Sequence, residues 1–358
     1  MAYTTINKPN TKFNTIIYTG NNNQSQTISG VGFQPDWIWI KNSDNVEWHH
    51  LMDVVRGDNK FLHTNNTDVE STGNRGNGHN ALAFTSDGFS ITNAGSLDGD
   101  LNFGSRPYPT WCWKADGTAS SNTDGTITSS VSVNTDSGVS IVTWTGTGAN
   151  ATVGHGLGSV PKMIIVKNRN VVTNWIVGGS LIEDVGGSTN NYMILNGTAA
   201  MDTSTTLYAS YNTDTIGVKT DANINGSGNG MLAYCFAEKQ GFSKFSTFTG
   251  NGNADGTFVY TGFKPAFFLW KNTTSAGYYW HIMDNERNPT NPAGESLFPN
   301  LVNAEIDYNS GNACDFLSNG FKFRTGSDGI NATNQVYIYM AFAENPLVGT
   351  NNVPATAR

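Results

Sequence analysis

The sequence is poor in charged side chains and in long apolar runs, and each shortage excludes a class of protein. Only 13% of its 358 residues are charged, against about 25% in an average domain. The net charge of −8 argues against a nucleic-acid partner, which requires a basic face. The longest apolar run, Val336 to Ala343, is far below the ~18 residues that span a membrane. We therefore expect neither nucleic-acid binding nor membrane insertion.

What the sequence does contain is one motif used three times: an aromatic-Thr-Gly turn, a proline, and a short apolar run that ends in Lys-Asn. The spacing from the glycine to the lysine is 21 residues in every copy, and the spacing from the proline to the lysine is 6. Constant spacing of this kind indicates one domain type repeated along the chain. The copies are Tyr18-Thr19-Gly20 with Pro35 and Lys41-Asn42, Trp144-Thr145-Gly146 with Pro161 and Lys167-Asn168, and Phe248-Thr249-Gly250 with Pro265 and Lys271-Asn272.

The composition favours short strands joined by tight turns. The chain has 40 glycines, and its β-branched and aromatic runs are separated by Asp-Gly and Asn-Gly pairs that are typical of hairpins. No stretch keeps a helical period for more than two turns. These patterns predict an all-β protein of three tandem antiparallel β-sandwich domains, jelly-roll or lectin-like, that could form a pseudo-threefold body. The predicted domains are residues 1–115, 116–240 and 241–358.

Cysteine is also scarce, and its placement follows the repeat. Three scattered cysteines are too few for a disulfide framework. Cys112 and Cys235 occupy the same repeat position, which Ala341 fills in the third copy, so this position should be a small buried slot in the last strand. The polar N-terminal segment lacks a signal-peptide core. We therefore expect the chain to fold in a reducing cytoplasm.

Two sets of side chains are candidates for ligand binding. Trp48 and Trp280, with Trp175 at the same place in the second copy, could stack on sugar rings, although their recurrence favours a role in the core. The first and third copies also share an Asp-x-x-Arg pair, which could clamp a ligand or could be a local ion pair that stabilises a turn. These pairs are Asp53 with Arg56 and Asp284 with Arg287.

One loop resembles the start of a calcium site. Asp98, Asp100 and Asn102 place oxygen atoms at alternate positions, as in an EF-hand loop. The bidentate glutamate that completes such a loop is missing, because Pro109 stands there. A turn without metal is the favoured interpretation, and no cofactor is expected.

Motifs of the common hydrolases and nucleotide-binding proteins are absent from the sequence. There is no G-x-S-x-G, no P-loop and no Cys/His pair at catalytic spacing. Hydrolysis of a glycosidic bond uses two paired carboxylates. Glu238 and Glu344 are equivalent by repeat, but neither is paired with a second carboxylate in the sequence. We therefore predict a protein that is not an enzyme, with a polysaccharide depolymerase as a weaker alternative because distant carboxylates can meet in a fold.

Several segments together resemble a family of virion proteins from tailed marine bacteriophages, including phages of cyanobacteria. They are the opening Met1 to Lys8, the Gly32 to Lys41 motif, the Asp53 to Gly57 segment, the Gly-rich Val153 to Gly158 with Lys167-Asn168-Arg169, and the close at Ala341 to Glu344 with Asn351 to Pro354. Members of that family are tail-fibre or structural proteins built from repeated β-domains, with no established catalytic residues. The resemblance spans essentially the whole chain.

This resemblance implies a virion protein that is assembled in the host cytoplasm and binds other virion proteins, as a homo-oligomer. The favoured function is that of a tail-fibre or receptor-binding adhesin that contacts host surface polysaccharide. The amide-rich, weakly charged composition suits hydrogen bonding to a glycan. The alternative is a capsid-decorating or tail-assembly protein that binds only other virion proteins.

Overall fold

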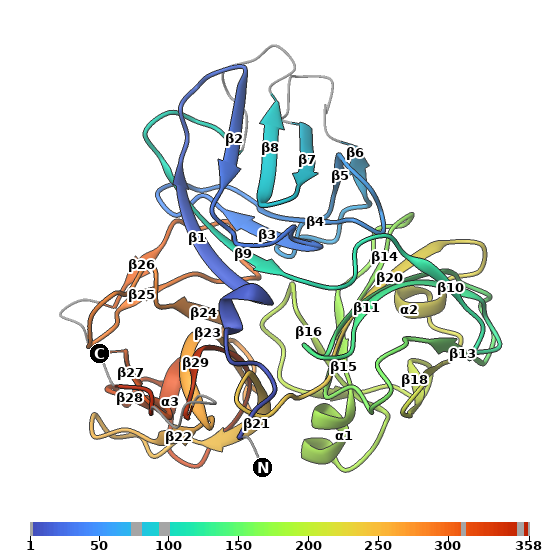
Figure 1. Cartoon of the computed structure of the whole chain (residues 1–358). Helices are drawn as coiled ribbons and strands as arrows, with labels where there is room; N and C mark the ends of the chain where they lie inside the picture. The colour runs from blue at the N-terminus through green and yellow to red at the C-terminus, as the bar shows by residue number, and fades with distance from the viewer. Residues whose placement is uncertain (1–2, 73–80, 93–100, 309–312, 349–353, 357–358) are drawn as a thin grey trace.

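The computed structural model describes residues 3–72, 81–92, 101–308, 313–348 and 354–356. It is an all-β structure in which every paired strand of the sheets is antiparallel to its neighbour (Figure 1). The α-helices of the described residues have only four to seven residues, and none of them is long and apolar enough to cross a membrane. The predicted all-β class, with sheets packed as sandwiches, is confirmed.

A main sheet with the same order of four strands occurs three times; in the second copy these four strands form the middle of an eight-stranded sheet. We call the surrounding units lobe 1 (residues 13–113), lobe 2 (residues 120–236) and lobe 3 (residues 243–346). In order across each sheet, the strands are β1 (Phe13–Thr19), β9 (Pro107–Trp113), β3 (Trp37–Lys41) and β4 (His49–Asp53); β12 (Val139–Thr145), β20 (Gly230–Phe236), β14 (Met163–Asn168) and β15 (Ile176–Gly178); and β21 (Ser243–Thr249), β29 (Val336–Pro346), β23 (Phe263–Asn272) and β24 (His281–Asp284).

A smaller, three-stranded outer sheet packs on each main sheet, again in one repeated order. Its strands are β2 (Ser25–Ser29), β8 (Gly88–Thr92) and β7 (Ala81–Thr85) in lobe 1; β13 (Ala151–Gly154), β19 (Thr215–Val218) and β18 (Tyr208–Tyr211) in lobe 2; and β22 (Phe258–Tyr260), β28 (Gly320–Phe323) and β27 (Cys314–Leu317) in lobe 3.

The remaining elements decorate this plan. In each lobe a short strand pair comes after the fourth main-sheet strand, β4, β15 or β24, in the chain. Lobe 2 adds two strands at the opposite edge of its main sheet. They are β5 (Lys60–Phe61) with β6 (Ser71–Thr72), β16 (Asn191–Ile194) with β17 (Asp202–Thr203), β25 (Glu295–Ser296) with β26 (Ile306–Asp307), and β10 (Ser120–Asn122) with β11 (Ser129–Asn134); the helices are η1 (Pro9–Thr11), α1 (Ser180–Gly186), α2 (Ala222–Asn225) and α3 (Asp328–Asn331).

The three main sheets enclose one central core between them. Trp37 at its centre stacks on Trp113 of its own lobe, with ring centroids 4.0 Å apart, and on Tyr234 of lobe 2 at 4.3 Å. Trp113 in turn meets Phe267 and Phe342 of lobe 3 edge-on. All five rings are fully buried. The lobes therefore share a single hydrophobic interior, around which Figure 1 shows them arranged.

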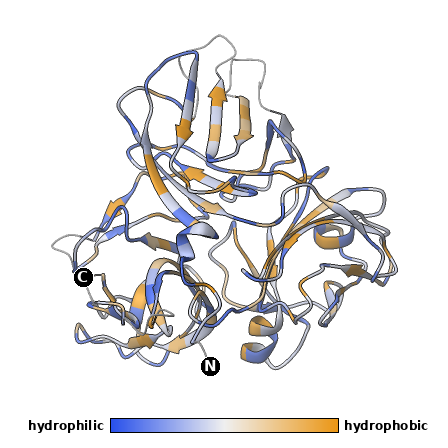
Figure 2. Ribbon diagram, in the orientation of Figure 1, coloured by the Kyte–Doolittle hydropathy of each residue, from blue (hydrophilic) through white to orange (hydrophobic). Residues whose placement is uncertain are grey.

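Each main-sheet strand alternates between this central core and the core of its own lobe. In β3, Trp37 and Trp39 face the centre, whereas Ile38 and Ile40 pack beneath the outer sheet of lobe 1. Both faces of the strand are thus buried, as the continuous apolar runs predict. Figure 2 shows the hydrophobic residues concentrated in the strands, with the connecting loops mostly hydrophilic or neutral. The small slot is also confirmed: Cys112, Cys235 and Ala341 are fully buried in β9, β20 and β29.

The sheets also respect the predicted division of the chain. Every sheet draws its strands from one of the ranges 1–115, 116–240 and 241–358. Because the lobes share the central core, these ranges are not three separate hydrophobic bodies. The domain boundaries and the jelly-roll or lectin-like subclass stay predictions.

The repeated glycine of the aromatic-Thr-Gly turn is required by a close backbone approach. A Cβ atom on Gly20 would lie 2.1 Å from the carbonyl oxygen of Phe103, and Gly146 and Gly250 meet equivalent carbonyls at 2.3 and 2.2 Å. No side chain fits at such a distance. The Lys-Asn end of the motif also has a structural role, because the Asn42 side chain accepts a hydrogen bond from the backbone two residues further on, as in an Asx turn.

The proline of the motif does not lie at the same place relative to the strand in every copy. Pro35 and Pro161 lie two residues before β3 and β14, whereas Pro265 is inside β23, where the pairing with β29 shifts register. The difference follows from the missing N–H group of proline, which a ladder tolerates only at its start or at a bulge.

The lobes are joined at three seams, each of which carries the same two backbone hydrogen bonds. The segment that comes after the fourth main-sheet strand, β4, β15 or β24, of one lobe binds the loop after the Lys-Asn motif of the next lobe. The cycle closes, since lobe 1 meets lobe 2, lobe 2 meets lobe 3, and lobe 3 meets lobe 1. The bonds run from N–H to carbonyl between Glu70 and Arg169 (2.9 Å), Thr173 and Thr67 (3.1 Å), Met201 and Thr273 (2.9 Å), Gly277 and Thr198 (2.9 Å), Glu305 and Ser43 (2.7 Å), and Glu47 and Val302 (2.9 Å).

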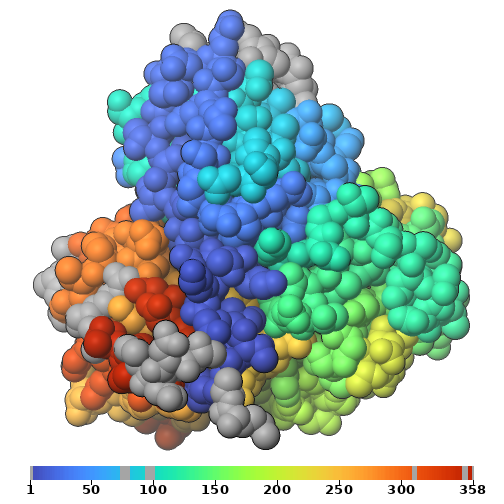
Figure 3. Space-filling view, in the orientation of Figure 1, coloured from blue at the N-terminus to red at the C-terminus, as the bar shows by residue number. Residues whose placement is uncertain are grey.

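No chain connection joins lobe 3 back to lobe 1, and the N-terminal segment bridges that gap. The Tyr3 hydroxyl donates to the carbonyl of Gly262 in lobe 3 at 2.6 Å, and Ile6 packs into the central core. Figure 3 shows this segment lying across the middle of the molecule between lobes 2 and 3. This segment, residues 3–12, which we call the strap, therefore ties the start of lobe 1 to lobe 3, the two lobes that no linker joins.

Candidate functional site

The Asp-x-x-Arg pairs are ion pairs at the end of the fourth main-sheet strand. Asp53 ends β4, and its carboxylate accepts from the backbone N–H of Arg56 at 2.9 Å and forms an ion pair with the Arg56 guanidinium. Asp284 and Arg287 repeat this arrangement in lobe 3, with an Nε–Oδ2 distance of 2.7 Å. The carboxylates and guanidiniums are almost completely enclosed. The structure thus has the ion pair, which is one of the two interpretations, and the ligand clamp stays a prediction.

The two aspartates also accept a hydrogen bond from the neighbouring lobe. The Tyr234 hydroxyl of lobe 2 donates to Asp53 at 2.9 Å, and the Trp111 indole N–H of lobe 1 donates to Asp284 at 3.1 Å. Tyr234 and Trp111 hold the same repeat position, one residue before the small slot. Burial first, and then the Asp53 charge, raises the pKa of Tyr234 well above its ordinary value, so this phenol stays a neutral donor. Each aspartate thus locks two lobes together.

The guanidiniums extend the first of these locks to the surface. Burial alone would lower the pKa of Arg56, but Asp53, Tyr234 and Glu70 raise it above its ordinary value. Glu70 lies 3.3 Å from Arg56 and accepts two hydrogen bonds of 2.8 Å from Arg169 of lobe 2. Burial would raise the pKa of Glu70, but the two arginines lower it. A chain of paired charges therefore crosses the seam between lobes 1 and 2.

The seam between lobes 2 and 3 has no such lock among its described residues. Gly179 stands where the other lobes have aspartate, and Met340 of lobe 3 stands where Tyr234 and Trp111 donate. Gly179 has a φ of +114°, and a Cβ atom there would lie 2.5 Å from the carbonyl oxygen of Lys162. An aspartate does not fit this backbone. The acceptor and the donor are thus both missing at the same seam.

Two of the three repeated tryptophans donate hydrogen bonds across the seams. Trp280 is fully buried, and its indole N–H donates to the carbonyl of Ile194 in lobe 2 at 2.9 Å. Trp175 makes the equivalent bond to His63 of lobe 1 at 2.8 Å. Trp48 is half-buried against the His63 ring, with centroids 4.7 Å apart. Trp280 therefore presents no exposed ring face, whereas Trp48 keeps part of its surface exposed, and the stacking platform stays a prediction.

The predicted calcium loop falls mostly outside the described residues, which leave out Asp98 and Asp100. Asn102 is described and buried; its side chain accepts from Asn21 and donates to Asn21 and Asn23, at 2.9 to 3.1 Å. In the described part of the chain, no group of three or more His, Cys, Asp or Glu residues could hold a metal ion. Asn102 therefore ties a turn together.

Asn102 has an equivalent buried asparagine in each of the other two lobes, which the sequence analysis missed. Asn225 and Asn331 bind the turn after the aromatic-Thr-Gly motif in the same way, accepting from backbone N–H groups at 2.9 and 3.1 Å. A signal was present, because each asparagine lies 10 residues before the small slot at Cys112, Cys235 or Ala341. The amide satisfies buried backbone donors that no strand reaches.

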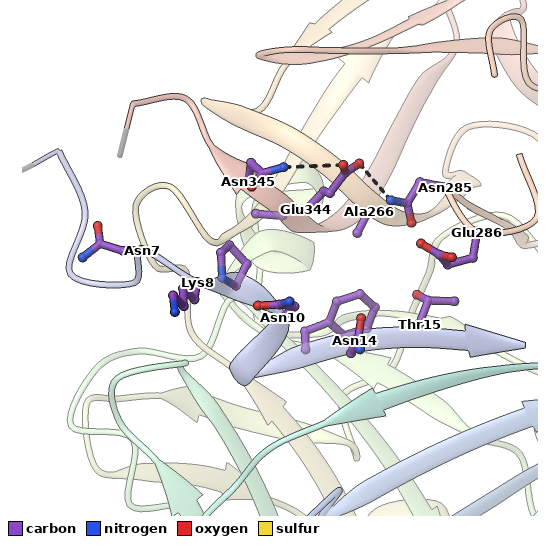
Figure 4. Close-up of a pocket in the computed structure, with 13 residues that line it drawn as sticks. Asn7, Lys8, Asn10, Asn14, Thr15, Ala266, Asn285, Glu286, Glu344 and Asn345 are labelled. Atoms are coloured by element: carbon purple, nitrogen blue, oxygen red, sulfur yellow. Dashed lines mark hydrogen bonds between the residues drawn. The ribbon is translucent and has the colours of Figure 1, made fainter. Parts of the chain in front are cut away.

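The described residues offer one amide-lined groove, at the seam between lobes 3 and 1. It has a volume of about 520 Å³ and lies between the N-terminal strap with the start of β1 and the end of β29. Figure 4 shows Asn7, Lys8 and Asn10 from the strap and Asn14 and Thr15 from β1, with Ala266, Asn285, Glu286, Glu344 and Asn345 on the lobe 3 side. Sequence reasoning missed these amides, because they lie at opposite ends of the chain.

One charged group of this groove, the Glu344 carboxylate, is held in a fixed position. Glu344 accepts from the side-chain amide of Asn285 at 2.8 Å and lies 3.2 Å from the ammonium of Lys264. Amide groups each offer two donor hydrogens and an acceptor oxygen. A polar, uncharged ligand rich in hydroxyl groups would match the hydrogen-bonding capacity of this wall better than a strongly charged one would.

A second groove of about 530 Å³ occupies the equivalent place between lobes 2 and 3, but its chemistry differs. It is lined by two ion pairs, Lys162 with Asp184 at 3.3 Å and Lys244 with Glu238 at 2.7 Å. Charged pairs thus replace the amides of the first groove. Both repeat glutamates, Glu238 and Glu344, therefore line grooves and pair with lysines.

A family model described as a domain of unknown function (DUF7483) matches residues 8–346. The match begins in the N-terminal strap and ends with β29, so it includes all three lobes and the amide-lined groove. A search of curated proteins found no match to this sequence.

Proposed function

The chain belongs to the DUF7483 family, and we propose that it is a bacteriophage virion protein that acts as a tail-fibre or receptor-binding adhesin. The observation that carries this proposal is the amide-lined groove between lobes 3 and 1. Its asparagine side chains come from the strap and from two lobes and surround a volume of about 520 Å³, which accommodates a small number of sugar units. Its ligand would be a host surface polysaccharide, bound through its hydroxyl groups.

The rigid frame supports an adhesin because it holds the groove open. The walls belong to different lobes, which the seam bonds and the central core fix relative to one another. Walls that are already in place avoid the ordering cost that a flexible site pays on binding. This design favours recognition of a repeated surface structure by many copies of one virion protein, each with modest affinity.

One observation favours the alternative of a capsid-decorating or tail-assembly protein. The closed cycle of seam bonds and the shared core make the chain a stiff building block, a property that suits packing against other virion proteins. A location restricted to the capsid surface in a virion reconstruction would favour this alternative. Binding to other virion proteins and homo-oligomerisation are expected of both functions.

The test is competition for adsorption. Purified protein should slow the adsorption of the phage that encodes it to its host, and the Asn10→Ala/Asn345→Ala double variant should lose this effect, because both amides are exposed in the groove. Asn150→Ala, an exposed amide in lobe 2, is the matched control and should compete like the parent protein. Failure of the parent protein to compete would overturn the adhesin. Release of reducing ends from host polysaccharide would instead support the depolymerase alternative.

A further inference from the structure

Lobe 3 exposes two aromatic rings on a strand where the other lobes have only threonine, serine or glycine. Phe258 and Tyr260 lie on β22 and are 45% and 53% exposed, while Val259 between them is buried. The register of the outer sheets places Thr27 and Ser29 of β2, and Thr152 and Gly154 of β13, at the same two positions. The inner positions, by contrast, are apolar and buried in all three lobes.

The fold does not account for these rings. Phe258 lies against Gly320, where an added Cβ atom would be 3.2 Å from the ring. Gly320 nevertheless needs no aromatic cover, because the equivalent Gly88 faces a polar position. Both glycines are required for another reason: their Cβ atoms would lie 2.0 and 2.1 Å from the carbonyl oxygens of Val259 and Ile28. Exposed apolar area without a folding role points to binding.

The surroundings of the pair define its ligand. β22 is the edge strand of its sheet, and alternate side chains on one face of a strand lie about 6.8 Å apart. Tyr3 of the strap reaches the same place, since its hydroxyl binds Gly262 and lies beside the Tyr260 ring. The neighbouring charge of Lys322 is paired with Asp255 at 2.5 Å. The surface is thus aromatic, with phenol hydroxyls and no unbalanced charge beside it.

We propose that Phe258 and Tyr260, with Tyr3 at their side, form an aromatic platform for a neutral, β-linked hexopyranose chain. β-linked sugars present flat C–H faces that pack on aromatic rings, while their rim hydroxyls can bond the phenol groups. This inference rests on the proposed function and places a second glycan contact on lobe 3. The single-lobe occurrence of the rings gives the molecule one such platform among its described residues.

The test uses cellohexaose as the probe, with binding followed by saturation-transfer NMR and titration calorimetry. The double variant Phe258→Thr/Tyr260→Ser gives β22 the residues of β2, so the sheet should still form. We expect it to weaken binding at least tenfold. Tyr279→Ser removes an aromatic that is 40% exposed elsewhere on lobe 3 and should leave binding unchanged. No binding by the parent protein, or equal binding by the double variant, would overturn the platform.

Two further outcomes separate this inference from the proposed function. If the double variant retains cellohexaose while Asn10→Ala/Asn345→Ala loses it, the platform fails and the groove adhesin stands. If the parent protein binds cellohexaose through the platform but does not compete for adsorption, the adhesin fails and the platform stands. Self-association that the double variant abolishes, without sugar binding, would show that a second copy of the chain covers β22 instead.

Discussion

The three seams share one backbone frame but differ in what fills it. At two of them a buried aspartate, Asp53 or Asp284, binds an arginine of its own lobe and a donor from the next lobe. At the third, which we call the apolar seam, Gly179 stands in place of the aspartate, and Met340 of the central core stands in place of the donor. Each of the three seams nevertheless has its two backbone hydrogen bonds. The backbone contact between lobes therefore does not depend on the buried charges.

This difference teaches that the acceptor and its donor form one unit. Where the aspartate is present, the next lobe supplies a hydroxyl or an indole N–H; where it is missing, the next lobe supplies a methionine. A buried carboxylate without partners is costly, and so is a buried donor without an acceptor. Buried ion pairs add little net stability but can fix which surfaces meet. We interpret the two locks as devices that fix the order of the lobes around the centre.

The largest expected effect is the loss of a lock carboxylate. Asp53→Ala and Asp284→Ala each leave a buried guanidinium without its main partner, so the free energy of unfolding should fall by about 3–5 kcal/mol. Urea denaturation followed by circular dichroism and tryptophan fluorescence measures this change. A loss below about 1 kcal/mol would show that water reaches the arginine. The seams with a buried aspartate would then not differ in energy from the seam that lacks one.

The next effect comes from the donor across the seam. Tyr234→Phe removes the hydrogen bond that the hydroxyl donates to Asp53 and the longer one, of 3.3 Å, that it accepts from Arg56. It keeps the Asp53–Arg56 pair, so it should cost about 1.5–3 kcal/mol. Met340→Leu at the equivalent position of the apolar seam is the matched control. This swap nearly conserves volume and should cost less than about 1.5 kcal/mol. Equal losses for the two variants would mean that packing, not the hydrogen bond, matters at this position.

The lysine of the repeated motif is buried in all three lobes. Burial lowers the pKa of Lys41, Lys167 and Lys271 to about 8 in each lobe. Lys271, for example, donates to the carbonyl of Asn272 at 2.8 Å. A lysine of the unfolded chain has a pKa near 10.4 and stays protonated above pH 8, where the folded one loses its proton. Stability should therefore rise with pH above 8.

This pH dependence is measurable between pH 8 and 9.5, below the ordinary pKa of tyrosine. Lys271→Met should remove about 1–2 kcal/mol of the rise in the free energy of unfolding over that interval. Substituting Lys41 or Lys167 should remove a similar share, because all three lysines are buried alike. A flat profile for the parent protein would show that the lysines remain charged in the folded state.

Much of this frame was predictable from the sequence, because it rests on local rules repeated three times. The constant spacing of Gly20, Lys41 and their equivalents predicted the repeat, and strand-length apolar runs between Gly-rich turns predicted the all-β class. The slot at Cys112 and Cys235 followed from aligning the copies. These features depend on a close backbone approach, on strand periodicity and on burial, each of which leaves a mark at a fixed position of the repeat.

The site was less predictable, because its parts meet only in three dimensions. Asn10 and Asn345 are at opposite ends of the sequence, and nothing in their local pattern brings them to one groove. The Asp53–Arg56 pair is local in sequence, but its further partner, Tyr234, belongs to another lobe. The sequence therefore shows no sign that this pair joins two lobes. Phe258 and Tyr260 have the residue types of an ordinary strand. Only the register of the outer sheets shows that β2 and β13 have threonine, serine or glycine at the same positions.

The smallest expected effect concerns the exposed ion pair of the apolar seam. Lys162 and Asp184 line the groove between lobes 2 and 3, but their side chains are 37% and 64% exposed. Water and salt screen such a pair, so Asp184→Ala should change the free energy of unfolding by less than about 1 kcal/mol, and by less still at 1 M salt. Urea denaturation at low and high salt, with Asp53→Ala as the buried counterpart, measures the contrast. A loss of about 3 kcal/mol for Asp184→Ala would mean that the third seam also depends on charge, carried at its surface instead of in its interior.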